Sequence, residues 1–354
     1  MGNGRLMTTR DGAVMKRLLG LMMAALLTAL PAAAQDFLVG ARPLGMGSAY
    51  TAQEGDANCV PWNPAGLASV NSIQFTSMYA DLYQLSFLKE SNFSVAVPLG
   101  RDRGVAGLGY SALSIDYDYP SYFNLNTLSW RDSEFRLSYA RPLNSAINVG
   151  ATFNWLSTTS NVEGGEMKGY SFDLGGQMRV LPQLTVGAAL LDLASHRTWD
   201  GSSGAESSGV GYRVGGLYRF DMGLRVALDA YGNSQSDDSL DGLALGFEYP
   251  LYYRASEQID ASRLRTVIAD MQELEEETAY NITLRTGLNH MFSGSEKNRL
   301  TLGGSFGMGM GTLDYAFIYD KDNLGNTHVV SLGLDFGRPS WHKQLTESSP
   351  APAR

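Results

Sequence analysis

Residues 147–155 read Ile-Asn-Val-Gly-Ala-Thr-Phe-Asn-Trp, so apolar residues alternate with polar residues or glycine. A period of two predicts a β-strand with one apolar face and one polar face. The same alternation is found at 170–180, 212–220 and 330–336. Two all-β arrangements fit: a soluble sandwich has its apolar faces inside, whereas a transmembrane antiparallel barrel turns them toward lipid and its polar faces toward the lumen.

The connections between these strands favour the barrel. Short turns such as 100–103 and 143–146 alternate with longer polar loops such as 118–129 and 195–208. Outer-membrane barrels combine short periplasmic turns with long external loops in this way. Strands are expected near 72–79, 85–98, 104–117, 131–142, 147–159, 169–180, 184–194, 209–220, 224–233, 242–252, 281–290, 299–307, 312–319 and 328–337. These are about 14 strands, and an even number places both ends of the barrel on the periplasmic side.

The beginning of the chain resembles an export signal. Lys16-Arg17 precede the apolar run 18–30, which is followed by Ala32-Ala33-Ala34. These are the three parts of a secretory signal peptide, and the run is shorter than the roughly 20 residues of a membrane-spanning helix. We expect a signal peptide at 1–34, with Met15 as the true start, and a location in the outer membrane of a Gram-negative cell.

Composition and charge exclude several other classes of protein. Residues 1–34 carry four basic and one acidic residue, so without them the net charge falls from −9 to −12, the wrong sign for nucleic acid. Cys59 is the single cysteine, so no intrachain disulfide can form.

The Gly-x-Ser-x-Gly motif at 303–307 lies inside an alternating strand, whereas a serine nucleophile needs a strand-to-helix turn. The histidines lack metal-ligand spacing. We expect no enzyme and no cofactor.

Residues 35–70 differ from everything that follows them. They contain Gly40-Ala41-Arg42-Pro43-Leu44-Gly45-Met46-Gly47 and end near Trp62-Asn63-Pro64-Ala65-Gly66-Leu67. This segment is too irregular for a strand and too apolar for a free tail. We therefore expect a plug at 35–70, folded into the lumen of a barrel that spans 71–337.

Local chemistry supports a compact plug. Asn63-Pro64 predicts a tight turn, because Pro fixes its own φ and restrains the residue before it, and the Asn side chain bonds readily to nearby backbone. The glycines allow close passage along the barrel wall. The candidate plug motif comprises Gly45, Gly47, Asn63, Pro64, Ala65 and Gly66. Charged residues on the polar strand faces are expected to form ion pairs in the lumen, namely Glu134, Arg136, Arg213, Arg219, Asp229, Glu248, Arg285 and Asp314.

Two further segments interrupt the pattern. Residues 255–279 lack Gly and Pro, place apolar residues at helical spacing and end in the acidic run 273–277. We expect a periplasmic helix here, which either packs across the barrel mouth or docks a partner. The tail 338–354 is polar and rich in Pro and Ser, and we expect it to be disordered.

Residues 40–49 and 63–67 resemble the N-terminal signature of the PorV/PorQ family, a branch of the FadL-like outer-membrane proteins. Residues 314–317, 324–328 and 331–334 are similar to the last hairpin of that family. The resemblance implies a fourteen-stranded barrel whose plug contains the Asn-Pro-Ala turn at residues 63–65. It also implies one of two functions.

The first function is that of a component or adaptor in type IX-like protein secretion, with secretion machinery or exported proteins as partners. The alternative is a FadL-like channel for hydrophobic small molecules. The polar inner faces favour the first function, because a hydrophobic ligand requires an apolar pocket.

Overall fold

The computed structural model describes residues 39–100, 103–118, 127–162, 164–236, 240–253, 280–291, 299–320 and 325–337. The expected signal peptide, the acidic insert 255–279 and the tail 338–354 lie outside these residues. Within the described ranges, no helix is both long and apolar enough to cross a membrane.

The described residues are mostly strands. The strands are β1 (Gln74–Asp81), β2 (Leu88–Pro98), β3 (Val105–Tyr117), β4 (Leu128–Pro142), β5 (Ile147–Ser160), β6 (Met167–Leu181), β7 (Leu184–Trp199), β8 (Ala205–Glu206), β9 (Gly211–Arg219), β10 (Arg225–Asn233), β11 (Gly242–Tyr253), β12 (Tyr280–Met291), β13 (Arg299–Met308), β14 (Gly311–Asp320) and β15 (Thr327–Asp335). The two-residue β8 pairs with β7 outside the ring of strands. The other fourteen match the strands expected from the alternation.

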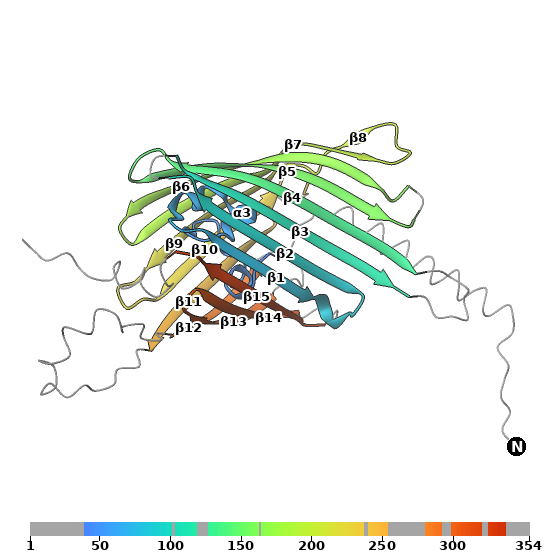
Figure 1. Cartoon of the computed structure of the whole chain (residues 1–354). Helices are drawn as coiled ribbons and strands as arrows, with labels where there is room; N and C mark the ends of the chain where they lie inside the picture. Colours follow the sequence, from blue (N-terminus) through green and yellow to red (C-terminus); the bar gives the residue numbers. More distant parts are fainter. Residues whose placement is uncertain are drawn as a thin grey trace, which may run out of the picture.

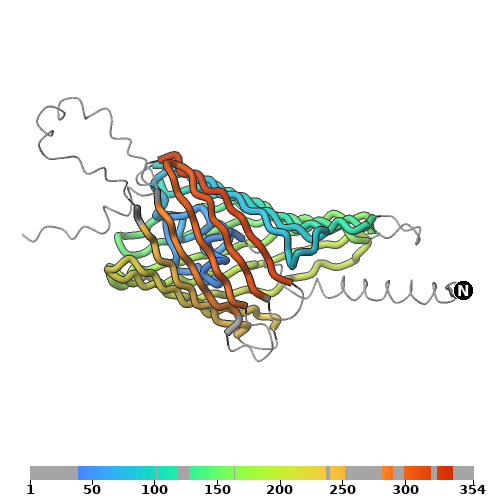
Figure 2. Tube along the Cα trace, turned by 90° about the horizontal axis from the view of Figure 1, so that it is seen from below, coloured from blue at the N-terminus to red at the C-terminus, as the bar shows by residue number. Residues whose placement is uncertain are grey.

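These fourteen strands close into an antiparallel barrel. Each strand pairs with its sequence neighbour, apart from β8, and β1 pairs with β15 to complete the ring. Figures 1 and 2 show the strands wrapped around a central segment near the N-terminus. Connections such as 143–146 and 182–183 are short, and those at the opposite end, such as 82–87 and 200–210, are longer. We call these ends the turn side and the loop side.

The orientation of the strand faces decides between barrel and sandwich. On β6, Tyr170, Phe172 and Leu174 are 39–50% exposed, whereas the intervening Ser171 and Asp173 are at most 5% exposed. Apolar side chains therefore point outward and polar side chains inward. This is the pattern of a transmembrane barrel, and it is opposite to that of a soluble sandwich.

Residues 39–70 lie inside the barrel and are called the plug. They form the short helices α2 (Ala41–Gly45) and α3 (Cys59–Trp62) and the 3-10 helix η1 (Pro64–Ser69). A further 3-10 helix, η2 (Leu82–Gln84), follows β1 on the loop side. Most plug residues are buried, and Figure 2 shows this segment in blue within the ring of strands. The lumen of this barrel is therefore occupied by the chain's own N-terminal segment.

Two apolar clusters pack around the plug. The first joins plug residues such as Val60, Trp62 and Leu67 to small wall residues such as Ala96 and Ala140. The second joins α2 to β1, β14 and β15, and includes Ala41, Leu44, Met78, Ala80, Leu82, Ala316, Ile318 and Val329. The plug thus supplies much of the apolar core that an empty lumen would lack.

Candidate functional site

Asn63 forms the tight turn expected at the Asn-Pro dipeptide. Its backbone is extended, and its Oδ1 accepts a hydrogen bond of 3.1 Å from the Ala65 N–H. Its Nδ2 donates to Thr51 O at 2.7 Å and also reaches the wall carbonyls of Gly176 and Ala188, at 3.3 and 3.4 Å. Asn63 therefore starts η1 and connects two parts of the plug to the β6–β7 wall.

The plug glycines do not all act as expected. A Cβ on Gly45 would lie 3.3 Å from Gly303 Cα, and one on Gly47 would lie 2.7 Å from Leu288 N, so both approach the wall. Gly47 also has a φ of 62°, which favours glycine. The expectation was wrong for Gly66, where a Cβ would meet Cys59 Sγ at 2.6 Å, an atom of the plug itself.

Glycines of the barrel wall also make room for the plug, and the sequence did not lead us to expect this. A Cβ at any of eight inward positions would come within 3.0 Å of a plug atom. These positions are Gly107, Gly109, Gly150, Gly175, Gly187, Gly246, Gly287 and Gly303. Glycine on the inward face of an alternating strand was the available signal, because such a residue leaves room for another backbone.

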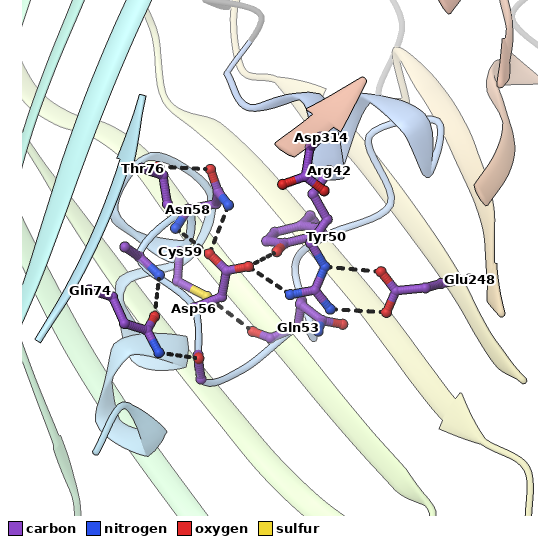
Figure 3. A network of polar contacts seen from close by, with 12 residues as sticks. Arg42, Tyr50, Gln53, Asp56, Asn58, Cys59, Gln74, Thr76, Glu248 and Asp314 are labelled. Carbon is purple, nitrogen blue, oxygen red and sulfur yellow. Dashed lines mark hydrogen bonds and ion pairs between the residues drawn. The ribbon is translucent and has the colours of Figure 1, made fainter. Parts of the chain in front are cut away.

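Arg42 is the centre of the polar network in Figure 3. Its Nε and Nη2 donate to the two oxygens of Glu248, each at 2.9 Å, and its Nη1 lies 2.6 Å from Asp56 Oδ2. Tyr50 donates its hydroxyl proton to the same Asp56 oxygen at 2.8 Å. Bidentate pairing of this kind combines strength with fixed geometry, so α2 is held to β11 in one orientation.

The network extends along the wall beyond Glu248. This carboxylate also pairs with Arg225 at 2.8 Å and with Arg285 at 2.7 Å, and Arg285 pairs with Asp314 at 2.8 Å. Three arginines thus face three carboxylates when Asp56 is included, so the group has no net formal charge. A balanced network avoids the large cost of an unpaired buried charge.

The lumen ion pairs expected from the sequence are largely present. Arg136 pairs with Glu134 at 2.6 Å, and Arg219 pairs with Glu54 of the plug at 2.8 Å. Arg213 differs, because its guanidinium stacks over Trp62 and Tyr231 at 4.6 and 5.0 Å. Aromatic faces attract such a cation, so Arg213 is an additional contact between the wall and the plug.

Asp229 holds the middle of the plug to β10. Its Oδ2 accepts hydrogen bonds from Tyr50 N and Thr51 N at 2.8 Å and from Thr51 Oγ1 at 2.6 Å. Asp229 is completely buried. A carboxylate that caps two backbone N–H groups satisfies donors which would otherwise be costly inside the lumen.

Three titratable groups of the plug have pKa values shifted from their ordinary ones. Burial raises the pKa of Tyr50 well above its usual value, and the nearby Asp56 carboxylate adds to this shift. Burial, again with Asp56, raises the pKa of the Cys59 thiol. Burial alone would lower the pKa of Arg42, but the Glu248 and Asp56 carboxylates raise it above its usual value. These shifts favour the uncharged thiol of Cys59 and the charged form of Arg42.

Apolar side chains collect in the lumen on the loop side of α2. Met78, Ala80 and Leu82 point inward from β1 and η2, and Ile318 and Val329 do so from β14 and β15. Tyr83, Leu88 and Leu113 extend this cluster toward β2 and β3. We call this group the loop-side cluster. It is a buried apolar cluster within a lumen whose strands otherwise present mostly polar residues.

A cavity of about 210 Å³ lies at the turn side, between plug and wall. It is lined by Glu54, Ala68, Ser69, Pro142, Asn144, Ser145, Ala146, Asn148, Gln177, Arg179 and Thr185. Ser69 accepts a hydrogen bond from Asn148 at 3.3 Å and donates one to Glu54 at 3.3 Å. Unlike the loop-side cluster, this turn-side cavity is mainly polar.

The parts of the chain that the structure describes hold no group of three His, Cys, Asp or Glu suited to a metal ion.

Comparison with known proteins identifies the fold. No protein-family model matches the sequence, and no curated protein matches it. The structure is similar to the P. putida toluene transporter TodX, with a TM-score of 0.55 and 12% identity over 84% of this chain and 98% of TodX. A TodX deltaS2S3 mutant, described as a monoaromatic hydrocarbon channel, gives a TM-score of 0.53 and 14% identity over 84% of this chain and 99% of that one. The closed barrel expected from the FadL-like resemblance is confirmed.

Proposed function

We propose that this protein is an outer-membrane channel for small hydrophobic molecules and that the plug closes its lumen. The loop-side cluster is the observation that carries the proposal. Sites for apolar ligands are concave and lined mainly by apolar side chains with few polar groups. Met78, Leu82 and Ile318 pack with Leu44 of α2 into a buried apolar cluster on the loop side, and we propose that an apolar molecule binds among these side chains.

The fold comparison supports the same function. TodX is described as a toluene transporter and as a monoaromatic hydrocarbon channel. Of the two functions implied by the PorV/PorQ resemblance, the hydrophobic channel is therefore better supported than the secretion adaptor. The outward apolar faces fit outer-membrane lipid as the surrounding partner.

Deletion of the gene tests the proposal against the secretion adaptor. We expect the deleted strain to take up radiolabelled toluene more slowly than the parent and to regain uptake when the gene is restored. Its surface-exported proteins, measured by labelling of intact cells, are expected to be unchanged. Loss of those proteins with normal toluene uptake would contradict the channel and support the adaptor.

A further inference from the structure

An open groove lies on the turn side, where β6 extends past the start of β5. Met178 pairs with Ile147, the first residue of β5, whereas β6 continues to Leu181. The groove adjoins the turn-side cavity, because Arg179 lines both. We call it the turn-side groove. Its volume is about 410 Å³, and its lining consists of Ser145, Ala146, Arg179, Val180, Leu181 and Pro182.

The turn-side groove continues the lipid-facing surface of the barrel. Met178 and Val180 belong to the outward row of β6 and are 43% and 48% exposed, and Leu181 at the end of the strand is 51% exposed. The short turns of outer-membrane barrels lie on the periplasmic side, below the outward apolar band. The groove therefore lies where the lipid tails of the periplasmic leaflet meet their headgroups.

Arg179 brings a positive charge to this groove. Its side chain is 49% exposed, against 26% or less for every other arginine that forms an ion pair in the described residues. Its Nη2 donates to Glu54 Oε1 at 3.1 Å, which is the only hydrogen bond of this side chain to a described residue. The same oxygen accepts from Arg219 at 2.8 Å. Because two guanidinium groups share Glu54, this carboxylate neutralises Arg179 only in part.

Ser145 is a second donor in the turn-side groove. It is exposed, and its hydroxyl makes no hydrogen bond to any residue that the structure describes. The turn that carries it is well defined, because Asn144 Oδ1 accepts from Ala146 N and Ile147 N, each at 2.8 Å. Arg179 N donates to Ala146 O at 2.8 Å and holds this turn beside β6. The groove thus combines a guanidinium and a hydroxyl with an apolar floor.

We propose that the turn-side groove binds an anionic phospholipid of the periplasmic leaflet. Arg179 and Ser145 donate to its phosphate, and Val180 and Leu181 contact its acyl chains. A guanidinium matches the geometry of a phosphate and can donate two parallel hydrogen bonds to it. Basic pockets at a membrane surface bind lipid headgroups in this way. Because Arg179 also bonds to Glu54, the bound lipid is connected to the plug.

Binding of a defined lipid to the purified full chain in detergent tests this site. Native mass spectrometry with palmitoyl-oleoyl-phosphatidylglycerol gives the Kd of the most tightly bound lipid. We expect Arg179→Gln to raise this Kd at least tenfold, because a neutral amide replaces the guanidinium. Arg103→Gln removes an exposed arginine from another turn on the same side and should change the Kd less than twofold. Equal effects of the two substitutions would show a general attraction of surface charge and overturn the site.

A second variant separates lipid binding from the contact with the plug. Ser145→Asp retains Arg179 and its ion pair with Glu54, but it places a carboxylate in the groove that repels phosphate. We expect the Kd to rise at least tenfold in this variant too. A Kd equal to that of the natural chain, in either Ser145→Asp or Arg179→Gln, would contradict the proposal. Heat-modifiable migration in gels confirms that each variant has folded.

Two competing probes distinguish the lipid from simpler ligands. Glycerol 3-phosphate carries the phosphate without acyl chains, and dioleoylglycerol carries acyl chains without the phosphate. At tenfold excess, neither is expected to displace phosphatidylglycerol. Displacement by glycerol 3-phosphate would make the groove a site for free phosphate esters, and displacement by dioleoylglycerol would make it a merely apolar surface, so either result overturns the proposal. Neither result bears on toluene uptake, which tests the channel function separately.

Discussion

Arg42 holds the plug to the wall through a bidentate ion pair. It joins Asp56 of the plug to Glu248 of β11, while Glu248 keeps two wall arginines of its own. Loss of Arg42 therefore leaves Glu248 paired with wall arginines, but it removes the link between plug and wall and also the ion pair of Asp56. Because a buried pair is costly to break from one side, we expect Arg42 to control how often the plug leaves its place.

Arg42→Met tests this role, with Cys59 as the reporter of plug release. Cys59 is buried in the closed state, so its alkylation in the folded barrel measures opening. We expect Arg42→Met to raise the rate of alkylation about tenfold or more. Glu134→Gln, which alters an ion pair between wall residues, is the control and should leave the rate unchanged. An unchanged rate in Arg42→Met would contradict the assignment.

The Cys59 thiol is expected to be alkylated slowly at pH 8. Burial and the Asp56 carboxylate raise its pKa, so the reactive thiolate is scarce at pH 8, where an ordinary thiol begins to ionise. We expect iodoacetamide at pH 8 to modify unfolded protein within minutes and folded protein at least a hundredfold more slowly. Equal rates in the two states would show that the thiol is accessible.

At the scale of elements, the turn at Asn63 connects the two halves of the plug. Asn63→Ala removes the cap on Ala65 N and the bond to Thr51 O, at a cost of about 1 kcal/mol. We expect the barrel to assemble but toluene uptake to change, because the plug no longer sits in one position. Pro64→Ala keeps the Asn63 bonds and should have the smaller effect. Unaltered uptake in both variants would leave the turn with a space-filling role.

The strands were predictable from the sequence, and the plug contacts were only partly so. Alternation fixes which face of a strand is apolar, as at Phe153 and Trp155, and it needs no knowledge of other strands. The bonds of Asn63 to Gly176 and Ala188 join residues more than 100 positions apart. Such contacts depend on closure of the ring, which no local pattern encodes. Gly66 was misassigned for a different reason, since the plug folds back on itself there and its neighbour is Cys59 rather than the wall.

For the whole molecule, a closed ring with apolar outer faces predicts behaviour in detergent. Such barrels keep their fold in cold detergent and unfold on boiling, so their migration in gels changes with heating. We expect outer-membrane extracts to show this shift for the present protein. Recovery as soluble periplasmic protein, with no shift on heating, would contradict a transmembrane barrel.

The central claim is that a plugged barrel admits hydrophobic molecules and excludes hydrophilic ones. The most direct measurement compares uptake of radiolabelled toluene and glucose by cells that make no channel, the intact protein, or a variant lacking residues 40–66. The intact protein is expected to raise toluene uptake severalfold and leave glucose uptake unchanged, whereas the variant admits glucose through its open polar lumen. Toluene uptake no greater than in cells without the protein, or glucose uptake equal in the intact and shortened forms, would contradict the account.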